Sequence, residues 1–138
     1  MRCQMTRVLI AEDSTVVQKM IQTILAKDKS IEIVGTPTDG ESAVRETNQQ
    51  KPDIVILDYR MPKMNAPEVI KQIMSQSPVP ILVFTGADPT EPKKQEVMAL
   101  GAVGFMEKPK NMEYNGIAVK LMTQIKTLSR LKPAKRTY

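Results

Sequence analysis

Polar residues that can do chemistry follow four short apolar segments of the chain. Glu12 and Asp13 come after the first segment, Asp58 ends "DIVILD", Thr85 ends "VPILVFT", and Lys108 follows "AVGFME". If these segments are parallel strands, their carboxyl ends meet at one edge of a sheet, where ligands of such folds bind. Three converging carboxylates raise one another's pKa, so a hard divalent cation with oxygen ligands would stabilise them. A hydroxyl and an ammonium group beside that cation would suit a phosphoryl group.

Each of these residues also has an ordinary structural explanation. An aspartate after a strand often caps the next helix, a threonine is a common strand residue, and a lysine before a proline often lies in a solvated loop. Their joint position at matching ends of four expected strands is what favours a phosphoryl site. Mg²⁺ is the expected cation and Mn²⁺ the alternative.

The composition restricts the chemistry that remains. The chain has no histidine and one cysteine, Cys3, which excludes zinc sites, Ser-His-Asp triads, Cys-His nucleophiles and an internal disulfide. A lone cysteine fits a reducing compartment, and the first ten residues lack the apolar segment of a secretory signal. The apolar runs are too short to cross a bilayer. We therefore expect a cytoplasmic protein.

The apolar segments that position these residues recur at a regular interval. Their β-branched and aromatic residues predict strands, with starts 22 to 26 residues apart, over residues 6–11, 31–36, 53–58, 79–85 and 102–107. This interval leaves room for one helix between successive strands, as in a parallel sheet with right-handed crossovers. The 138 residues are too few for a closed eight-unit barrel. We expect one α/β domain with an open, doubly wound, five-stranded parallel sheet.

Helical periodicity occupies the intervals between the expected strands. The helix over 40–50 has the weakest apolar face. The fourth helix has Thr90 as a candidate cap and Gly101 as its stop, and the last helix ends before Pro133. Ser14 is a candidate N-cap for the first helix, whose apolar stripe is Val16, Val17, Met20, Ile21, Ile24 and Leu25.

The net charge of +5 is concentrated near the C-terminus. Six of the 20 basic residues lie beyond residue 116, with no acidic residue among them, so the rest of the chain is nearly neutral. We expect a domain over 1–131 and a disordered basic tail or linker over 132–138. Contact with a membrane surface or with nucleic acid are the alternatives for this tail. The few aromatic residues and the lack of a recognition-helix module after residue 128 argue against direct nucleic-acid binding.

Four blocks of the sequence resemble the signature blocks of the response-regulator receiver domain of two-component signalling. They read "VLIAEDS", "DIVILDYRMPKMNA", "ILVFTGA" and "GFMEKP", and the resemblance extends over roughly residues 5 to 128. It implies a flavodoxin-like (βα)5 receiver fold with strand order 2-1-3-4-5, an order that the spacing alone does not provide. It also implies a switch with Mg-dependent self-phosphorylation and self-dephosphorylation and no separate catalytic domain.

The resemblance assigns roles to the acidic residues. Asp58 would accept a phosphoryl group from the phosphohistidine of a sensor histidine kinase. Glu12 and Asp13, together with Asp58 and the main-chain carbonyl of Arg60, would hold Mg²⁺.

It also implies a switch that involves three further residues. Thr85 and Lys108 would bind oxygens of the phosphoryl group, and Phe105 would move inward when Thr85 is drawn toward that group. The change would be largest on the face made by the fourth helix, the fifth strand and the fifth helix. A downstream partner or a fused output domain would bind there.

Two positions depart from the family's usual pattern. In "KMNA", Asn65 and Ala66 stand where an acidic residue and a glycine are usual, so the conformation of this loop is open. Arg60 is larger and more charged than many residues at its place. One hypothesis is that its guanidinium pairs with Glu12 or shields the acyl phosphate from water; the other is that it is solvated.

Three functions remain open at this point. The first is a stand-alone signalling switch. The second is the receiver half of a chemotaxis protein-glutamate methylesterase, because "EIVGTPTDGESAV", "QSPVPILVFTG" and "LGAVGFMEKPK" are particularly similar to that receiver; "LSRLKPAKRT" would then be the linker to a catalytic domain outside this sequence. The third is a flavodoxin-type electron carrier, although "EDSTVV" puts carboxylates where a flavin phosphate would bind.

Overall fold

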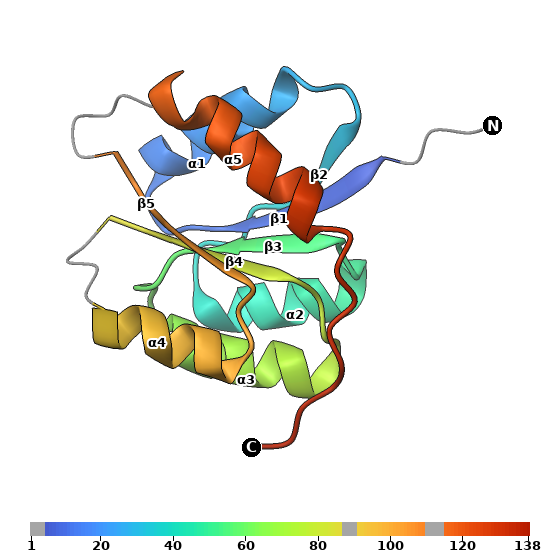
Figure 1. Ribbon diagram of the computed structural model, residues 1–138, viewed down its shortest axis with the longest axis vertical. Helices are drawn as coiled ribbons and strands as arrows, with labels where there is room; N and C mark the ends of the chain where they lie inside the picture. Colours follow the sequence, from blue (N-terminus) through green and yellow to red (C-terminus); the bar gives the residue numbers. More distant parts are fainter. Residues whose placement is uncertain (1–4, 87–90, 110–114) are drawn as a thin grey trace.

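The computed structural model describes residues 5–86, 91–109 and 115–138 (Figure 1). Its sheet is parallel throughout and has the strand order β2-β1-β3-β4-β5 that the resemblance implied. Every strand lies within its predicted range, so the predicted fold class is confirmed. The strands are β1 (Thr6–Ala11), β2 (Ile31–Gly35), β3 (Ile54–Leu57), β4 (Ile81–Thr85) and β5 (Gly104–Glu107).

Three strands, β3, β4 and β5, begin later than the apolar runs predict. β4 begins at Ile81 because a proline has no backbone N–H to donate, although the carbonyl of Pro80 still accepts a hydrogen bond from the backbone N–H of Val55 at 2.9 Å. β3 begins after Asp53, whose carboxylate accepts a hydrogen bond from the backbone N–H of Arg7 at 2.8 Å. Asp53 and Asp58 therefore flank opposite ends of the same strand.

Helices cover both faces of the sheet. α1 and α5 lie on one face and α2, α3 and α4 on the other (Figure 1). The central strand β3 is buried on both sides, with Val55 and Leu57 facing one helix layer and Ile54 and Ile56 the other. In the described part of the chain, no helix has the length and hydropathy needed to cross a bilayer. The helices are α1 (Thr15–Ala26), α2 (Gly40–Gln50), α3 (Ala66–Gln76), α4 (Glu91–Leu100) and α5 (Asn115–Leu128).

The helix ends follow local capping chemistry. Ser14 caps α1 as predicted, because its Oγ accepts a hydrogen bond from the backbone N–H of Val17 at 3.3 Å. Val16 is 55% exposed, so its assignment to the buried stripe is wrong. α2 spans the predicted residues 40–50 despite its weak apolar face, since Asp39 caps it by accepting a 2.8 Å hydrogen bond from a backbone N–H in its first turn. Thr90 lies outside the described residues.

The loop "KMNA" needs no glycine in this protein. Ala66 is the first residue of α3 and is fully buried, so a positive φ is not required there. The positive φ of this loop falls at Lys63, at 71°. A Cβ on Gly40 would lie 2.3 Å from the carbonyl oxygen of Met64, so a glycine at the start of α2 is what lets this loop come close.

The C-terminal segment departs most from the sequence-based expectation. The segment over 132–138, expected to be a disordered basic tail or linker, has no helix or strand but contacts the domain: the backbone N–H of Arg136 donates to the carbonyl of Met74 at 3.0 Å, and its Nη1 donates to the carbonyl of Ala99 at 2.8 Å. The hydroxyl of Tyr138 donates to the carbonyl of Leu100. Figure 1 shows this segment running from the end of α5, past the edge at which the strands begin, to the opposite helix layer.

Candidate functional site

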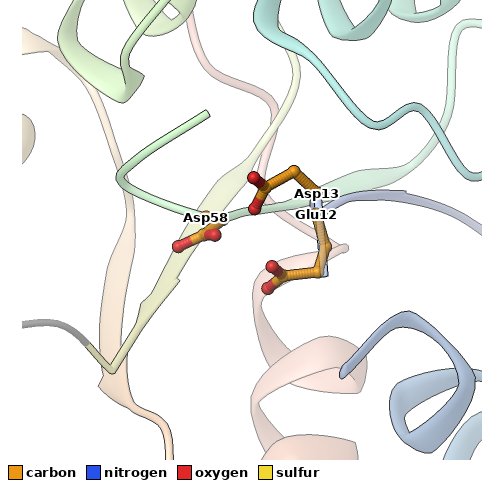
Figure 2. Close-up of side chains that lie close together, drawn as sticks. All are labelled: Glu12, Asp13 and Asp58. Carbon is orange, nitrogen blue, oxygen red and sulfur yellow. The ribbon is translucent and has the colours of Figure 1, made fainter. Parts of the chain in front are cut away.

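Three carboxyl groups converge where β1 and β3 end. Glu12 and Asp13 directly follow β1, Asp58 directly follows β3, and one carboxylate oxygen of each lies within 4.8 Å of the other two (Figure 2). Glu12 is 2% exposed and Asp58 is 7% exposed, whereas Asp13 is open to solvent. The parallel register brings these residues together because β1 and β3 are neighbours and end level with each other, Ala11 pairing with Leu57.

Lys108 lies against two of these carboxylates. Its Nζ is 2.6 Å from Oε1 of Glu12 and 3.3 Å from Oδ2 of Asp58. Thr85 is buried at the end of β4, and its carbonyl accepts a hydrogen bond from the backbone N–H of Lys108 at 2.9 Å. The five side chains predicted for phosphoryl and metal chemistry therefore lie at the carboxyl edge of the sheet.

Burial dominates the electrostatics of Glu12 in this cluster. Burial raises the pKa of Glu12 to about 7, and the nearby Asp58 acts in the same direction, while Lys108 opposes both. Burial alone would lower the pKa of Lys108, but the hydrogen bond to Glu12 and the charge of Asp58 raise it above its ordinary value. One lysine thus compensates only part of the negative charge gathered here.

The donor set fits a hard divalent cation. All three side chains offer carboxylate oxygens, and Mg²⁺ binds oxygen at about 2.1 Å, so opposite ligands of one ion lie roughly 4.2 Å apart. A spread of 4.8 Å needs only a small inward movement to reach that value. An open pocket beside the carboxylates, lined by Asp13, Arg60 and Asn65 among others, gives access from solvent.

Two further residues, Arg60 and Phe105, were predicted to take part in the site. Arg60 is exposed and lines the open pocket, whereas Glu12 pairs with Lys108 and accepts a hydrogen bond from the backbone N–H of Ser14 at 3.2 Å. Phe105 is half-buried against the core on the side of α2, α3 and α4. The Arg60 hypothesis and the switch role of Phe105 remain predictions.

Two residues that the sequence reasoning did not single out help to position this site. A Cβ on Gly86 would lie 3.0 Å from Cβ of Lys108 and 3.2 Å from its Cδ, so the glycine leaves room for the lysine stem. Tyr59, next to the predicted acceptor, donates a hydrogen bond from its hydroxyl to Oε1 of Glu96 at 2.8 Å. The position of Gly86, directly after Thr85, could have been noticed in the sequence. No sequence pattern near Tyr59 predicts its contact with α4.

Comparison with known proteins agrees with this geometry. Residues 8–117 match the family model of the response regulator receiver domain. A protein-glutamate methylesterase/protein-glutamine glutaminase of Methanococcoides burtonii is 32% identical over 126 residues, which are 90% of this chain and 36% of that protein. The response regulator domain of Thermotoga maritima CheB has a TM-score of 0.89 at 26% identity, covering 94% of this chain and 100% of that one.

A third relative carries a metal. The receiver domain of the sensor histidine kinase PA1611 from Pseudomonas aeruginosa PAO1 has a magnesium ion coordinated in its active site cleft. It has a TM-score of 0.75 at 22% identity and covers 91% of this chain and 98% of that one. At this identity the likeness shows a shared fold.

Fold and site together define a doubly wound α/β domain with an acidic site at the carboxyl edge of its sheet. The chain belongs to the response regulator receiver domain family, the phosphorylation-regulated switches of two-component signalling. A receiver domain is a regulatory unit, and the family membership does not favour an electron carrier. The matched part of the chain covers 36% of the length of the methylesterase relative.

Proposed function

We propose that Asp58 is the phosphoryl acceptor of this switch and that a sensor histidine kinase is the donor. The observation that carries the proposal is the convergence of three carboxylates within 4.8 Å, with Lys108 2.6 Å from one of them, at the edge where the sheet opens to solvent. Asp58 is almost fully buried yet follows its strand directly, so it is held in place by the sheet and not by a mobile loop.

The chain's own residues account for the transfer step. An oxygen of Asp58 attacks phosphorus, and the bond between phosphorus and the imidazole nitrogen of the donor breaks, which leaves an acyl phosphate on Asp58 and a free histidine on the kinase. Lys108, which contacts Asp58 at 3.3 Å, pairs with a phosphoryl oxygen of the product. The hydroxyl of Thr85 donates to another.

Glu12, Asp13, Asp58 and the main-chain carbonyl of Arg60 would hold Mg²⁺. When bound, the ion neutralises charge on the transferring phosphoryl group. The shared carboxylate chemistry and the magnesium in the related PA1611 receiver support this assignment. Mn²⁺ is the alternative ion.

The output is proposed to pass through the face of α4, β5 and α5 to a protein partner or a fused output domain, in a chemotaxis setting. Similarity to the protein-glutamate methylesterase supports that setting. The cytoplasmic location and the absence of direct nucleic-acid binding stay predictions.

Treatment with acetyl phosphate and Mg²⁺, followed by intact-mass spectrometry, tests the acceptor. We expect a single added phosphoryl group that Asp58→Asn abolishes. Asp53→Asn is the matched control, because Asp53 flanks the other end of the same strand, where its carboxylate accepts a hydrogen bond from the backbone N–H of Arg7. Addition of the group to Asp58→Asn, or its loss in both variants, would contradict the assignment.

A further inference from the structure

α4 is the helix whose position depends least on apolar packing. Among its side chains that the structure describes, Val97 is buried and Leu100 half-buried, whereas Lys94, Gln95 and Met98 are exposed. α3, by comparison, buries five residues. Because a helix with so narrow an apolar face is weakly fixed by the core, polar contacts at its ends carry much of its positioning.

The C-terminal segment supplies such contacts at the carboxyl end of α4. The last carbonyl groups of a helix have no partner within the helix, and they carry partial negative charge. The guanidinium of Arg136 donates to the carbonyl of Ala99 at 2.8 Å, and the hydroxyl of Tyr138 donates to the carbonyl of Leu100. A cation and a hydroxyl donor thus satisfy neighbouring orphan acceptors.

The same segment also binds the end of α3. The backbone N–H of Arg136 donates to the carbonyl of Met74 at 3.0 Å. A Cβ on Gly101, which ends α4 with a φ of 131°, would lie 3.6 Å from Cζ of Arg136 and 3.1 Å from Cγ of Met74. Arg136 therefore occupies the junction between the two helix ends and joins both to the segment that leaves α5.

We propose that residues 131–138 form a clasp that holds α4 in the arrangement of the unphosphorylated protein and that phosphorylation of Asp58 loosens it. The release step rests on the proposed function, in which the face of α4, β5 and α5 changes with phosphorylation. Hydrogen bonds weaken steeply with distance and angle, so α4 cannot move relative to α3 while Arg136 keeps its bonds to both. A shift of α4 and release of the clasp are coupled events.

The hold on α4 is tested without phosphorylation, by amide hydrogen exchange of the full chain. Arg136→Ala removes the donor to Ala99, and the loss of one net hydrogen bond predicts about fivefold faster exchange at residues 97–100. Lys135→Ala is the matched control, because it removes an equal charge from an exposed neighbouring position. Equal exchange at residues 97–100 in the two variants would overturn the clasp.

The release step is tested with beryllium fluoride and Mg²⁺, which mimic the acyl phosphate. We expect the amide of Arg136 to exchange faster in the wild-type chain on addition, and not in Asp58→Asn. Because coupling is reciprocal, Arg136→Ala should bind the mimic tighter by the same factor, about fivefold.

The outcomes separate the two proposals. Binding of the mimic with unchanged exchange at Arg136 would overturn release and leave the acceptor assignment intact. Failure of acetyl phosphate to modify Asp58 would overturn the proposed function and, with it, the release step, while the exchange comparison at residues 97–100 still decides whether the segment holds α4.

Discussion

The carboxylates at the ends of β1 and β3 differ in exposure. Glu12 is buried against Lys108, whereas Asp13 faces solvent, so Asp13 is the more accessible of these two proposed metal ligands. Burying a charge is costly unless it is paired, which is why Glu12 has a lysine at 2.6 Å. The exposed fraction of Asp58, 7%, lies between that of the buried Glu12 and that of the exposed Asp13.

Gly86 offers a test of how closely Lys108 must be positioned. In Gly86→Ala the new Cβ would lie 3.0 Å from Cβ of Lys108, so the lysine stem has to move by a few tenths of an ångström. A misplaced charge-compensating group slows transfer, and we expect the rate of phosphorylation by acetyl phosphate to fall about threefold or more.

Gly116→Ala is the control for this substitution. A Cβ on Gly116 would have no heavy atom within 4 Å apart from its chain neighbours and the backbone of its own helix, so the phosphorylation rate of Gly116→Ala should equal that of the wild type. Equal rates for the two alanine variants would show that Lys108 tolerates the displacement.

At the scale of elements, Tyr59 links the loop after β3 to α4. Its hydroxyl donates to Glu96 at 2.8 Å, and Nζ of Lys93 lies 5.4 Å from the centre of its ring. The residue beside the proposed acceptor is therefore bonded directly to the helix that we expect to move. Glu96 lies near the middle of α4, three residues before Ala99, whose carbonyl accepts from Arg136.

Tyr59→Phe removes the hydroxyl and keeps the ring under Lys93. Loss of one net hydrogen bond predicts about fivefold faster amide exchange at residues 96–100 in the unphosphorylated protein. Lys94→Gln, an exposed change on the same helix, should leave exchange there unchanged. Exchange in Tyr59→Phe that matches this control would mean that Glu96 does not restrain α4.

At the scale of the whole molecule, a bound cation should stabilise the fold. A ligand at one hundred times its Kd that binds only the folded state adds about 2.7 kcal/mol to the free energy of unfolding. For a chain of this length we expect a rise of about 8 °C in Tm when MgCl2 replaces NaCl at equal ionic strength.

Asp13→Asn is the sharpest variant for this measurement. Asp13 is exposed, so its substitution should change the Tm of the metal-free protein little, while the rise with Mg²⁺ should shrink. An undiminished rise in Asp13→Asn would argue that the ion binds elsewhere.

Much of the fold and most of the proposed site could be predicted from the sequence. The spacing of the apolar runs determined five βα units, and parallel strands necessarily bring their carboxyl ends to one edge, so Glu12, Asp13, Asp58, Thr85 and Lys108 had to lie along that edge. Helix ends followed from short-range chemistry, as with the cap at Ser14. These features depend on residues close in sequence or on the repeat itself.

Only the tertiary structure decided which residues far apart in the sequence form hydrogen bonds with one another. Tyr59 and Arg136 each donate a hydrogen bond to a residue 37 positions away. No local sequence pattern predicts either pair. The tail looked disordered because it is basic and poor in apolar residues, yet its donors meet helix carbonyls that become available only when α3 and α4 end side by side. Contacts of this kind arise from the packing of complete elements, and the physical reason is that orphan backbone acceptors exist only once the helices have formed.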